Sequence, residues 1–342
     1  MNDPFRFPAA FNDGFVKGLQ RQLETDSLGA LILVLANAAF DPAVWERMHP
    51  AIARRFAQRE SEVRDRLRAG EAVPGPEDDL FVFLKLMAAG FDGLGSAEFR
   101  RVGAWELQYN PLRGLRPERM AARTVDAIEA PFDPDGFHFG LPYLQPEVFW
   151  EGRLAGLQLR CLYNKFPFAP YHLLLVPEPS AQRPQHLQKD SLDWIWRVAD
   201  SAGALLPGFG VGYNSYGAFA SVNHLHFQAF LRELPLPLED PRWHHNGGTE
   251  AYPATCHVAR DVQAAWRLVE QCRLAGTAHN IILRPGAMYV LPRRLQGSYA
   301  SADWMGGHAW YEMAGGAVVP RRSMFDTLEG RQIADALAVT AF

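Results

Sequence analysis

The first hundred residues carry the apolar spacing and the breaking residues of helices. Asp41 followed by Pro42 is typical of a helix N-cap and first helical position, and the charged stretch over residues 44–69 is typical of a solvated helix. A Pro-Gly-Pro break then precedes a second, apolar helix expected over residues 80–89. We therefore expect a helical N-terminal region over residues 1–104.

From about residue 105 the pattern changes to short apolar runs separated by turn residues. These runs predict strands over residues 137–139, 157–163, 172–176, 211–213 and 221–232, with a helix over residues 191–206 between the third and the fourth. Ser191 is the expected N-cap of that helix. The order is typical of an α+β unit with an antiparallel sheet.

A weaker version of the same plan follows. The pattern predicts a helix over residues 261–274, a hairpin over residues 280–283 and 288–291 with a Pro-Gly turn, and a last helix from about residue 322. We therefore expect a duplicated architecture, with a catalytic half over residues 105–245 and a degenerate half over residues 246–342.

Composition and charge narrow the class of protein. The 34 Lys and Arg residues against 38 Asp and Glu give a formal net charge of −4, which does not favour nucleic acid as a partner. The longest largely apolar run, residues 28–40, is shorter than the roughly 20 residues that span a membrane, and no secretory signal is recognised. The three cysteines are widely spaced, without a zinc or disulfide pattern, so we expect a reducing, cytoplasmic location.

The stretch from Asn223 to Gln228 carries two histidines and an amide at alternating positions. Alternate side chains of a strand share one face, so His224, His226 and Gln228 are expected on one side of the last predicted strand of the catalytic half. Three polar side chains on one face are costly to bury unless they are hydrogen-bonded or bind a ligand. This triplet is therefore the leading candidate for chemistry.

Three interpretations of the triplet remain open on these residues alone. The histidines can be hydrogen-bonded residues of an ordinary sheet. His-x-His can hold a metal ion, although no Asp, Glu or Cys stands at a nearby position on the same face to supply a third ligand. One histidine can act as a nucleophile towards phosphorus, with its neighbours positioning the phosphate.

The motif His-x-His-x-Gln resembles the transferase branch of the histidine-triad superfamily, whose hydrolases carry a third histidine in place of the glutamine. The longer run over residues 212–229 is most similar to the GDP-hexose phosphorylases of plants and animals. Further similar segments are residues 107–110 with Arg113, Asn164, and residues 172–177, 278–280 and 290–293. The resemblance covers the chain from about Trp105 onward, and it implies a histidine-triad-like antiparallel sheet with flanking helices.

The resemblance also implies roles for individual residues. His226 would be the nucleophile that takes the nucleoside monophosphate, and the backbone carbonyl of His224 would hold its ring in the required tautomer. Gln228 and Ser221 would bind the transferred phosphoryl group. These roles agree with elementary chemistry, because a neutral imidazole has an unperturbed pKa of about 6.5 and a departing phosphate monoester needs no strong acid.

Further substrate-binding candidates flank the motif. Asn223 belongs to the motif itself, Gly217 is expected to let the backbone approach a phosphate, and Asn214 is either a phosphate or ribose ligand or a turn residue. Arg113 matches an arginine of the phosphorylases, and Lys165 is a positional candidate, both for the second phosphate. Either cation can instead be an ordinary solvated residue.

The leading interpretation is therefore a nucleotide-sugar phosphorylase that works through a nucleotidyl-His226 intermediate. The expected partners are a GDP-hexose and inorganic phosphate, with no cofactor, no metal, no nucleic acid and no membrane, and a homodimer is possible. The alternative within the same chemistry is a dinucleoside polyphosphate phosphorylase or ATP adenylyltransferase. The alternatives from other classes are a metal-binding protein that uses His224 and His226 and a catalytically silent nucleotide-binding module.

Overall fold

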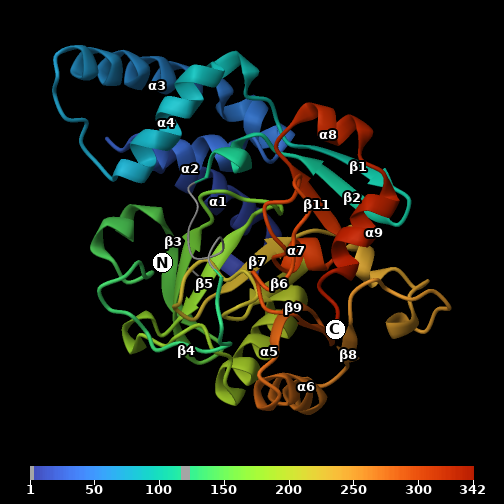
Figure 1. Ribbon diagram of the computed structural model, residues 1–342. Helices are drawn as coiled ribbons and strands as arrows, with labels where there is room; N and C mark the ends of the chain where they lie inside the picture. The colour runs from blue at the N-terminus through green and yellow to red at the C-terminus, as the bar shows by residue number, and fades with distance from the viewer. Residues whose placement is uncertain (1–3, 117–123) are drawn as a thin grey trace.

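Four helices make up most of the N-terminal region in the computed structural model, which describes residues 4–116 and 124–342 (Figure 1). They are α1 (Pro8–Leu23), α2 (Leu28–Ala38), α3 (Pro42–Arg68) and α4 (Glu77–Ala89). Asp41 caps α3, because its Oδ1 accepts from the backbone N–H groups of Ala43 and Val44 at 2.8 and 3.2 Å. The predicted helical region and this N-cap are confirmed.

Helix α2 is the centre of this region, since all of its residues are buried. Its length and composition explain the apolar run seen in the sequence, because a helix surrounded by other elements is apolar on every side. In the part of the chain that the structure describes, no helix is both long enough and apolar enough to cross a membrane.

A large sheet forms the body of the molecule, with eight strands in the order β3-β4-β5-β7-β6-β9-β10-β8 and every neighbouring pair antiparallel. The strands are β3 (Val148–Leu154), β4 (Leu157–Tyr163), β5 (Leu173–Pro177), β6 (Phe209–Asn214), β7 (Phe227–Leu231), β8 (His257–Ala259), β9 (Ala278–Arg284) and β10 (Ala287–Arg293). Together with the helices they confirm the predicted α+β class.

The two faces of this sheet bury different neighbours. Helices α5 (Lys189–Gly203) and α6 (Val262–Leu274) share one apolar core with alternate residues of the strands, such as Phe227 and Ala229 of β7. The residues that alternate with them along β7, Gln228 and Phe230, point to the opposite face. The alternation read from the sequence therefore holds along β7.

A smaller sheet lies against the large one. It consists of β1 (Glu98–Val102), β2 (Trp105–Tyr109) and β11 (Gly316–Val319), with β2 antiparallel to β1 and parallel to β11. The short helices α7 (Trp310–Met313), α8 (Arg322–Thr327) and α9 (Gly330–Ala338) complete this part of the chain (Figure 1). Segments more than 200 residues apart thus lie side by side.

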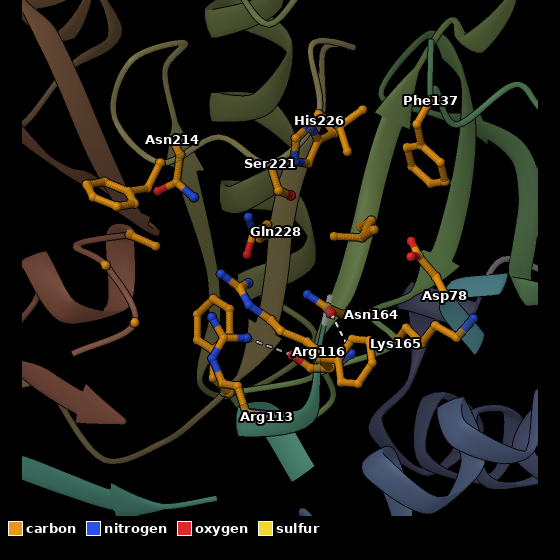
Figure 2. A pocket seen from close by; sticks show the side chains of 18 of the residues that line it. Asp78, Arg113, Arg116, Phe137, Asn164, Lys165, Asn214, Ser221, His226 and Gln228 are labelled. Atoms are coloured by element: carbon orange, nitrogen blue, oxygen red, sulfur yellow. Dashed lines mark hydrogen bonds between the residues drawn. The ribbon is translucent and has the colours of Figure 1, made fainter. Parts of the chain in front are cut away.

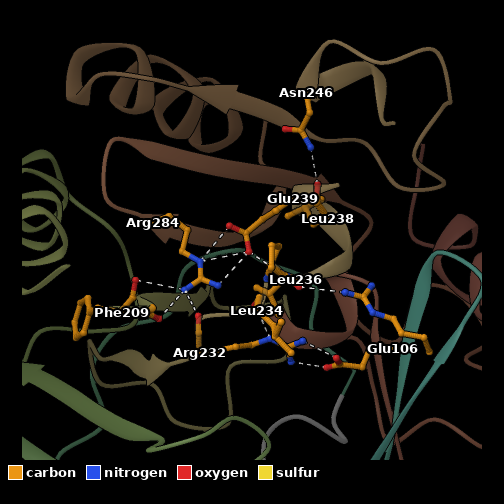
Figure 3. Close-up of polar contacts among 12 residues, drawn as sticks. Glu106, Phe209, Arg232, Leu234, Leu236, Leu238, Glu239, Asn246 and Arg284 are labelled. Atoms are coloured by element: carbon orange, nitrogen blue, oxygen red, sulfur yellow. Dashed lines mark hydrogen bonds and ion pairs between the residues drawn. The ribbon is translucent and has the colours of Figure 1, made fainter. Parts of the chain in front are cut away.

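A buried ion pair joins the two sheets (Figure 3). Arg232, just after β7, donates both terminal nitrogens to the carboxylate of Glu106 on β2 at 2.5 Å each, and the Tyr311 hydroxyl donates to the same carboxylate at 2.6 Å. Nearby, Arg284 at the end of β9 pairs with Glu239 at 3.1 Å. Each guanidinium thereby joins the end of a strand to a distant segment, Arg232 to β2 and Arg284 to the short 3-10 helix over residues 237–239.

The stretch predicted as one strand over residues 221–232 is a strand only in its second part, since β7 begins at Phe227. The backbone before it binds partners outside the sheet: Leu225 N–H donates to the Arg183 carbonyl at 2.8 Å, and His226 N–H donates to a glutamine side chain at 2.9 Å. The two histidines of the motif therefore lie in the loop that enters β7. A strand needs a neighbouring strand, and no strand among residues 4–116 and 124–342 pairs with this loop.

Three other expectations are corrected. Residues 137–139 form no strand, because the backbone N–H of Phe139 binds a side chain, the imidazole of His224. Helix α5 begins at Lys189, so Ser191 lies in its first turn and is not the N-cap. The helix expected from residue 322 is divided into α8 and α9 by the extended backbone of Leu328.

The two predicted halves share one sheet, because β6 pairs with β9 across the expected boundary at residue 245. The boundary at residue 104 falls in the turn of the β1–β2 hairpin. The duplication and the three-part division of the chain stay predictions.

Candidate active site

A cleft of about 1360 Å³ lies on the face of the large sheet opposite α5 and α6. Figure 2 shows His226, Ser221 and Gln228 on one side of it and Asp78 with Lys165 on another. Its lining comes from the first turn of α4, the segments after β2 and β4, the loop before β7, and residues 303–320. The cleft therefore collects side chains from the helical region, the large sheet and the C-terminal segment, and it is large enough for a ligand of several parts.

One ring nitrogen of His226 is hydrogen-bonded to the protein backbone. Its Nδ1 lies 2.8 Å from the backbone carbonyl oxygen of His224, to which it donates. Burial lowers the pKa of the His226 imidazole to about 4, so the ring is neutral at ordinary pH and carries a single proton. Because that proton is on Nδ1, the lone pair is on Nε2 of a residue that lines the cleft.

The backbone of His226 is clamped by the side chain of Gln185. Gln185 Oε1 accepts from His226 N–H at 2.9 Å, and Gln185 Nε2 donates to the His226 carbonyl at 3.2 Å. The same Nε2 donates to the Asn214 carbonyl at 2.8 Å. The Gln185 side chain thus makes the hydrogen bonds that a neighbouring strand would make, and it fixes His226, the candidate nucleophile, directly before β7 begins.

Asn223 supports this clamp. Its Oδ1 accepts from the backbone N–H of Gln185 at 3.0 Å, and its Nδ2 donates to the carbonyls of Ala130 and Pro131 at 3.2 and 2.7 Å. Although Asn223 lines the cleft, its polar atoms are engaged with the protein. Asn223 therefore stabilises the loop through its hydrogen bonds to three backbone groups.

His224 presents no free lone pair. Its Nδ1 accepts from the backbone N–H of Phe139 at 3.1 Å, and burial lowers its pKa to about 3, so the single proton is on Nε2. The two imidazoles therefore do not offer a pair of lone pairs to one ion. Among the described residues, no group of three or more His, Cys, Asp or Glu side chains could hold a metal ion.

Gln228 has its carbonyl oxygen saturated. Oε1 lies 2.9 Å from Trp310 Nε1 and 3.0 Å from His172 Nε2. His172 is neutral, because burial lowers its pKa to about 3, and its Nδ1 accepts from the backbone N–H of Phe168 at 3.3 Å, which leaves the proton on Nε2. Two donors thus occupy both lone pairs of Oε1. The amide nitrogen is the group that Gln228 can offer to the cleft.

The Asn164 amide does not disturb this assignment. Its Nδ2 lies 3.2 Å from Nε2 and 3.5 Å from Nδ1 of His172. Asn164 Oδ1 accepts from the backbone N–H of Phe166 at 3.0 Å, so Nδ2 can only donate, and both ring nitrogens of His172 are already engaged with Phe168 and Gln228. His172 therefore links the backbone of Phe168 to the Gln228 side chain through its two ring nitrogens.

Asn214 repeats the arrangement of Gln228. Its Oδ1 accepts from Asn280 Nδ2 at 2.8 Å and from the backbone N–H of Trp310 at 2.7 Å. Asn280 is itself held by Arg293, whose Nη1 donates to Asn280 Oδ1 at 3.2 Å. Asn214 lines the cleft (Figure 2), so its amide nitrogen is a second oriented donor.

Two arginines bring positive charge to the cleft. Arg113 Nη1 donates to the Phe166 carbonyl at 2.9 Å, and its guanidinium lies 4.1 Å from the centre of the Phe168 ring. Burial, together with the charge of Arg116, lowers the pKa of Arg113 to about 9, which still leaves it charged at neutral pH. Arg116 also lines the cleft (Figure 2), and a bound anion would relieve the repulsion between the two guanidinium groups.

The structure places the substrate-binding candidates Lys165 and Gly217 differently. Lys165 lines the cleft, but its Nζ lies 2.6 Å from Asp79 Oδ1 and 3.4 Å from Glu147 Oε1, so two carboxylates already balance its charge. Gly217 is not a lining residue. Its φ of +80° and a gap of 2.6 Å between a would-be Cβ and Leu295 explain the glycine by the turn and its packing.

Sequence reasoning missed Gln185, Arg116 and Trp310. The first lies in a loop before α5 and the last in a helix of one turn, where the sequence carries no motif. Arg116 could have been found, because it follows Arg113 by three residues.

Comparison with known proteins supports the resemblance stated from the sequence. Residues 158–230 match a family model described as "GDPGP1-like, N-terminal domain". GDP-D-glucose phosphorylase 1 of Homo sapiens is 36% identical over 141 residues, and GDP-L-galactose phosphorylase 2 of Arabidopsis thaliana is 41% identical over 151 residues. The matched part is 39% of this chain in both cases, but only 35% of the human protein and 34% of the plant protein.

The fold is also similar to a solved structure. The crystal structure of yeast Ap4A phosphorylase Apa2 matches 79% of this chain and 96% of its own chain, with a TM-score of 0.52 and 17% sequence identity. The predicted antiparallel fold is therefore confirmed well beyond the segment that the sequence comparisons cover.

Proposed function

We propose that this protein is a nucleotidyltransferase of the phosphorylase type, which converts a GDP-hexose and inorganic phosphate into GDP and a hexose 1-phosphate. The observation that carries the proposal is the pairing of His226, whose Nε2 lone pair is free, with the oriented amide of Gln228 in one cleft. The similarity to GDP-hexose phosphorylases supports the choice of substrate class.

The first step is attack by His226 Nε2 on the α-phosphorus of the nucleotide sugar. The N–P bond forms, the bond from phosphorus to the bridging oxygen breaks, and its electron pair leaves with hexose 1-phosphate. The leaving phosphate has a second pKa of about 6, so it departs without a strong general acid. During this step Gln228 and Ser221 donate hydrogen bonds to the phosphoryl oxygens, where negative charge is concentrated.

The second step returns the histidine to its starting form. An oxygen of inorganic phosphate attacks the same phosphorus, the N–P bond breaks, and its electron pair returns to Nε2 as GDP forms. While the nucleotidyl group is attached, the ring carries a positive charge, which the His224 carbonyl stabilises through Nδ1–H. This charge makes the imidazole a good leaving group. The contact of 2.8 Å between His226 Nδ1 and the His224 carbonyl oxygen therefore supports both the formation and the breaking of the N–P bond.

The diphosphate of the substrate needs positive charge, and Arg113 with Arg116 would supply it. Both line the cleft, and the Arg113 guanidinium donates to the backbone carbonyl of Phe166, whereas Lys165 is held between the carboxylates of Asp79 and Glu147. We therefore assign the second phosphate to Arg113, with Arg116 beside it in the cleft lining, and not to Lys165.

The experiment that tests the proposal measures phosphate-dependent release of nucleoside diphosphate. The panel is GDP-, ADP- and UDP-hexoses with diadenosine tetraphosphate, each with and without phosphate. Release of GDP that requires phosphate is the expected result; release from diadenosine tetraphosphate alone would favour the dinucleoside polyphosphate activity instead.

A trapping experiment identifies the nucleophile. Without phosphate, incubation with GDP-hexose should attach one nucleoside monophosphate to the peptide that contains His226, as an adduct stable in alkali and labile in acid. His226→Asn should abolish the adduct, whereas His245→Asn, which changes a histidine outside the cleft lining, should not. An adduct on the His226→Asn variant would overturn the covalent mechanism.

The homodimer and the cytoplasmic location remain predictions. The cysteines support a reducing compartment, since Cys161, Cys256 and Cys272 are all unpaired.

A further inference from the structure

Trp310 donates both of its N–H groups to amide side chains that line the cleft, those of Gln228 and Asn214. Its indole Nε1 lies 2.9 Å from Gln228 Oε1, and its backbone nitrogen lies 2.7 Å from Asn214 Oδ1. Trp310 is completely buried and begins α7, a helix of the C-terminal segment. A single residue, 82 positions after Gln228, thus contacts both amides on the side away from the ligand.

We propose that Trp310 is a positioning residue that keeps the NH₂ group of Gln228 directed at the transferred phosphoryl group. The inference rests on the proposed function, in which that NH₂ stabilises the phosphoryl oxygens. It assigns the positioning of a catalytic side chain to the C-terminal segment, to which neither the motif nor the matched family segment extends.

The reason is that the two ends of an amide differ chemically but hardly in shape. A flipped Gln228 would set its NH₂ against two N–H donors and turn its carbonyl oxygen towards the anionic phosphate. Of the two donors, His172 could change its tautomer only by losing the hydrogen bond that the backbone N–H of Phe168 donates to its Nδ1. The indole N–H is a donor only, so Trp310 is the partner that cannot accommodate the flipped amide.

The surroundings hold the indole in place. Its ring is stacked on Phe230 with a centroid distance of 4.9 Å and an interplanar angle of 11°. On another side, a Cβ at Gly212 would lie 2.3 Å from Trp310 Cδ2, so residue 212 must be a glycine for the indole to fit. Gly212 belongs to β6, and it is paired directly with Gln228 across the sheet. The strand next to Gln228 therefore makes room for the indole that orients it.

The test is a double-mutant cycle between Trp310→Phe and Gln228→Ala. Trp310→Phe removes the indole donor and keeps an aromatic ring. We expect it to lower kcat for phosphorolysis about five- to tenfold, the effect of one net hydrogen bond, with a smaller change in KM. In the Gln228→Ala background the same substitution should have almost no further effect on kcat. Equal losses in both backgrounds would mean that Trp310 acts only through packing, and would overturn the inference.

Trp243→Phe is the matched control. It also removes an indole donor from a buried tryptophan, since Trp243 Nε1 donates to the Pro237 carbonyl at 2.8 Å, but Trp243 is not a residue of the cleft lining. Its effect on kcat should be the same with and without Gln228. A Trp243→Phe effect that also vanished in the Gln228→Ala background would show that the cycle reports a general loss of packing, and would overturn the inference.

A spectroscopic measurement separates this inference from the proposed function. The indole ¹H–¹⁵N resonance of Trp310, identified by its loss in Trp310→Phe, should move upfield in Gln228→Ala because its acceptor is gone. This holds whether or not the protein turns over a nucleotide sugar. An unchanged resonance would refute the contact, whereas a shifted resonance with no nucleotidyl-His226 adduct in the wild type would refute the proposed function alone.

Discussion

Lys165 and Asp79 form an ion pair of 2.6 Å that joins the segment after β4 to the first turn of α4. This contact brings the helical N-terminal region to the edge of the cleft, where Asp78 and Asp79 become part of the wall. A region outside the segment that matches the family model, residues 158–230, thus helps to shape the site. Because Lys165 is paired with Asp79, its charge is not available to bind a phosphate.

Substitution of Arg113 should affect KM, whereas substitution of Lys165 should mainly affect stability. Arg113→Met should raise KM for the nucleotide sugar at least tenfold, because it removes a charge that faces the diphosphate. Lys165→Met should change KM much less, while lowering stability because Asp79 and Glu147 lose their shared partner. Steady-state kinetics and urea denaturation of both variants measure this contrast. A larger KM effect from Lys165→Met would reverse our assignment.

The pKa of His226 predicts an unusual pH profile. An imidazole with a pKa of about 4 stays neutral at pH 5.5, where one with the ordinary value of about 6.5 would be roughly ten-elevenths protonated. The rate of nucleotidyl-His226 formation should therefore be flat from pH 7.5 to 5.5. Single-turnover measurements without phosphate are needed, since phosphate itself titrates in this range. A tenfold fall over this interval would contradict the expected neutral histidine.

The same buried histidines predict how stability depends on pH. His172, His224 and His226 have lowered pKa values in the folded protein, so below about pH 6.5 the unfolded chain binds protons that the folded protein does not. The free energy of unfolding should therefore fall as the pH drops from 6.5 towards 4, by up to about 1.4 kcal/mol per pH unit for each histidine. Urea denaturation at several pH values checks the slope, and His226→Asn should make it shallower.

Gln185 predicts a coupled loss of stability and activity. Gln185→Leu keeps a similar volume but leaves the N–H of His226 and the carbonyls of His226 and Asn214 without their partner. We expect a loss of about 1–3 kcal/mol in the free energy of unfolding and a larger fall in kcat than in substrate affinity. The reason is that the loop carrying the nucleophile would no longer be fixed. Unchanged kcat in a folded Gln185→Leu protein would contradict this role.

The ion pair between Arg232 and Glu106 gives a prediction about the junction of the two sheets. Glu106→Leu should cost about 3–5 kcal/mol, because it leaves a buried guanidinium unpaired. The double variant Glu106→Leu with Arg232→Met should recover most of that loss, since no buried charge remains. Thermal and urea denaturation of the single and double variants would decide this. A double variant as unstable as the single one would show that the pair contributes a specific structural constraint.

The sequence could predict what is local and periodic. The helices of the first hundred residues, the strand over residues 157–163 and the hairpin over residues 280–291 depend on neighbours in the chain. The candidate residues of the Asn223–Gln228 stretch can also be read from the sequence, and their chemistry is still a prediction. The loop with the two histidines is predicted as a strand, because polar and apolar residues alternate along it. The same alternation fits a loop whose backbone is held by Gln185, 41 residues from His226. The partners of Gln228 and Lys165 lie 82 and 86 residues away and carry no periodic signal. Pairing across such separations is set by the tertiary fold.

The parallel pairing of β2 with β11 limits how early the proposed activity can begin while the protein is being made. Glu106 of β2 lies opposite Gly316 of β11, so a ribosome that adds about 5–20 residues per second needs roughly 10–40 s between the two. For nearly all of this time the helix that begins at Trp310 has not been synthesised, and His226 lies in a chain that lacks this part of its surroundings. Under the proposed function, nucleotidyl transfer must therefore wait until residues 310–319 have been made and have folded onto the sheet.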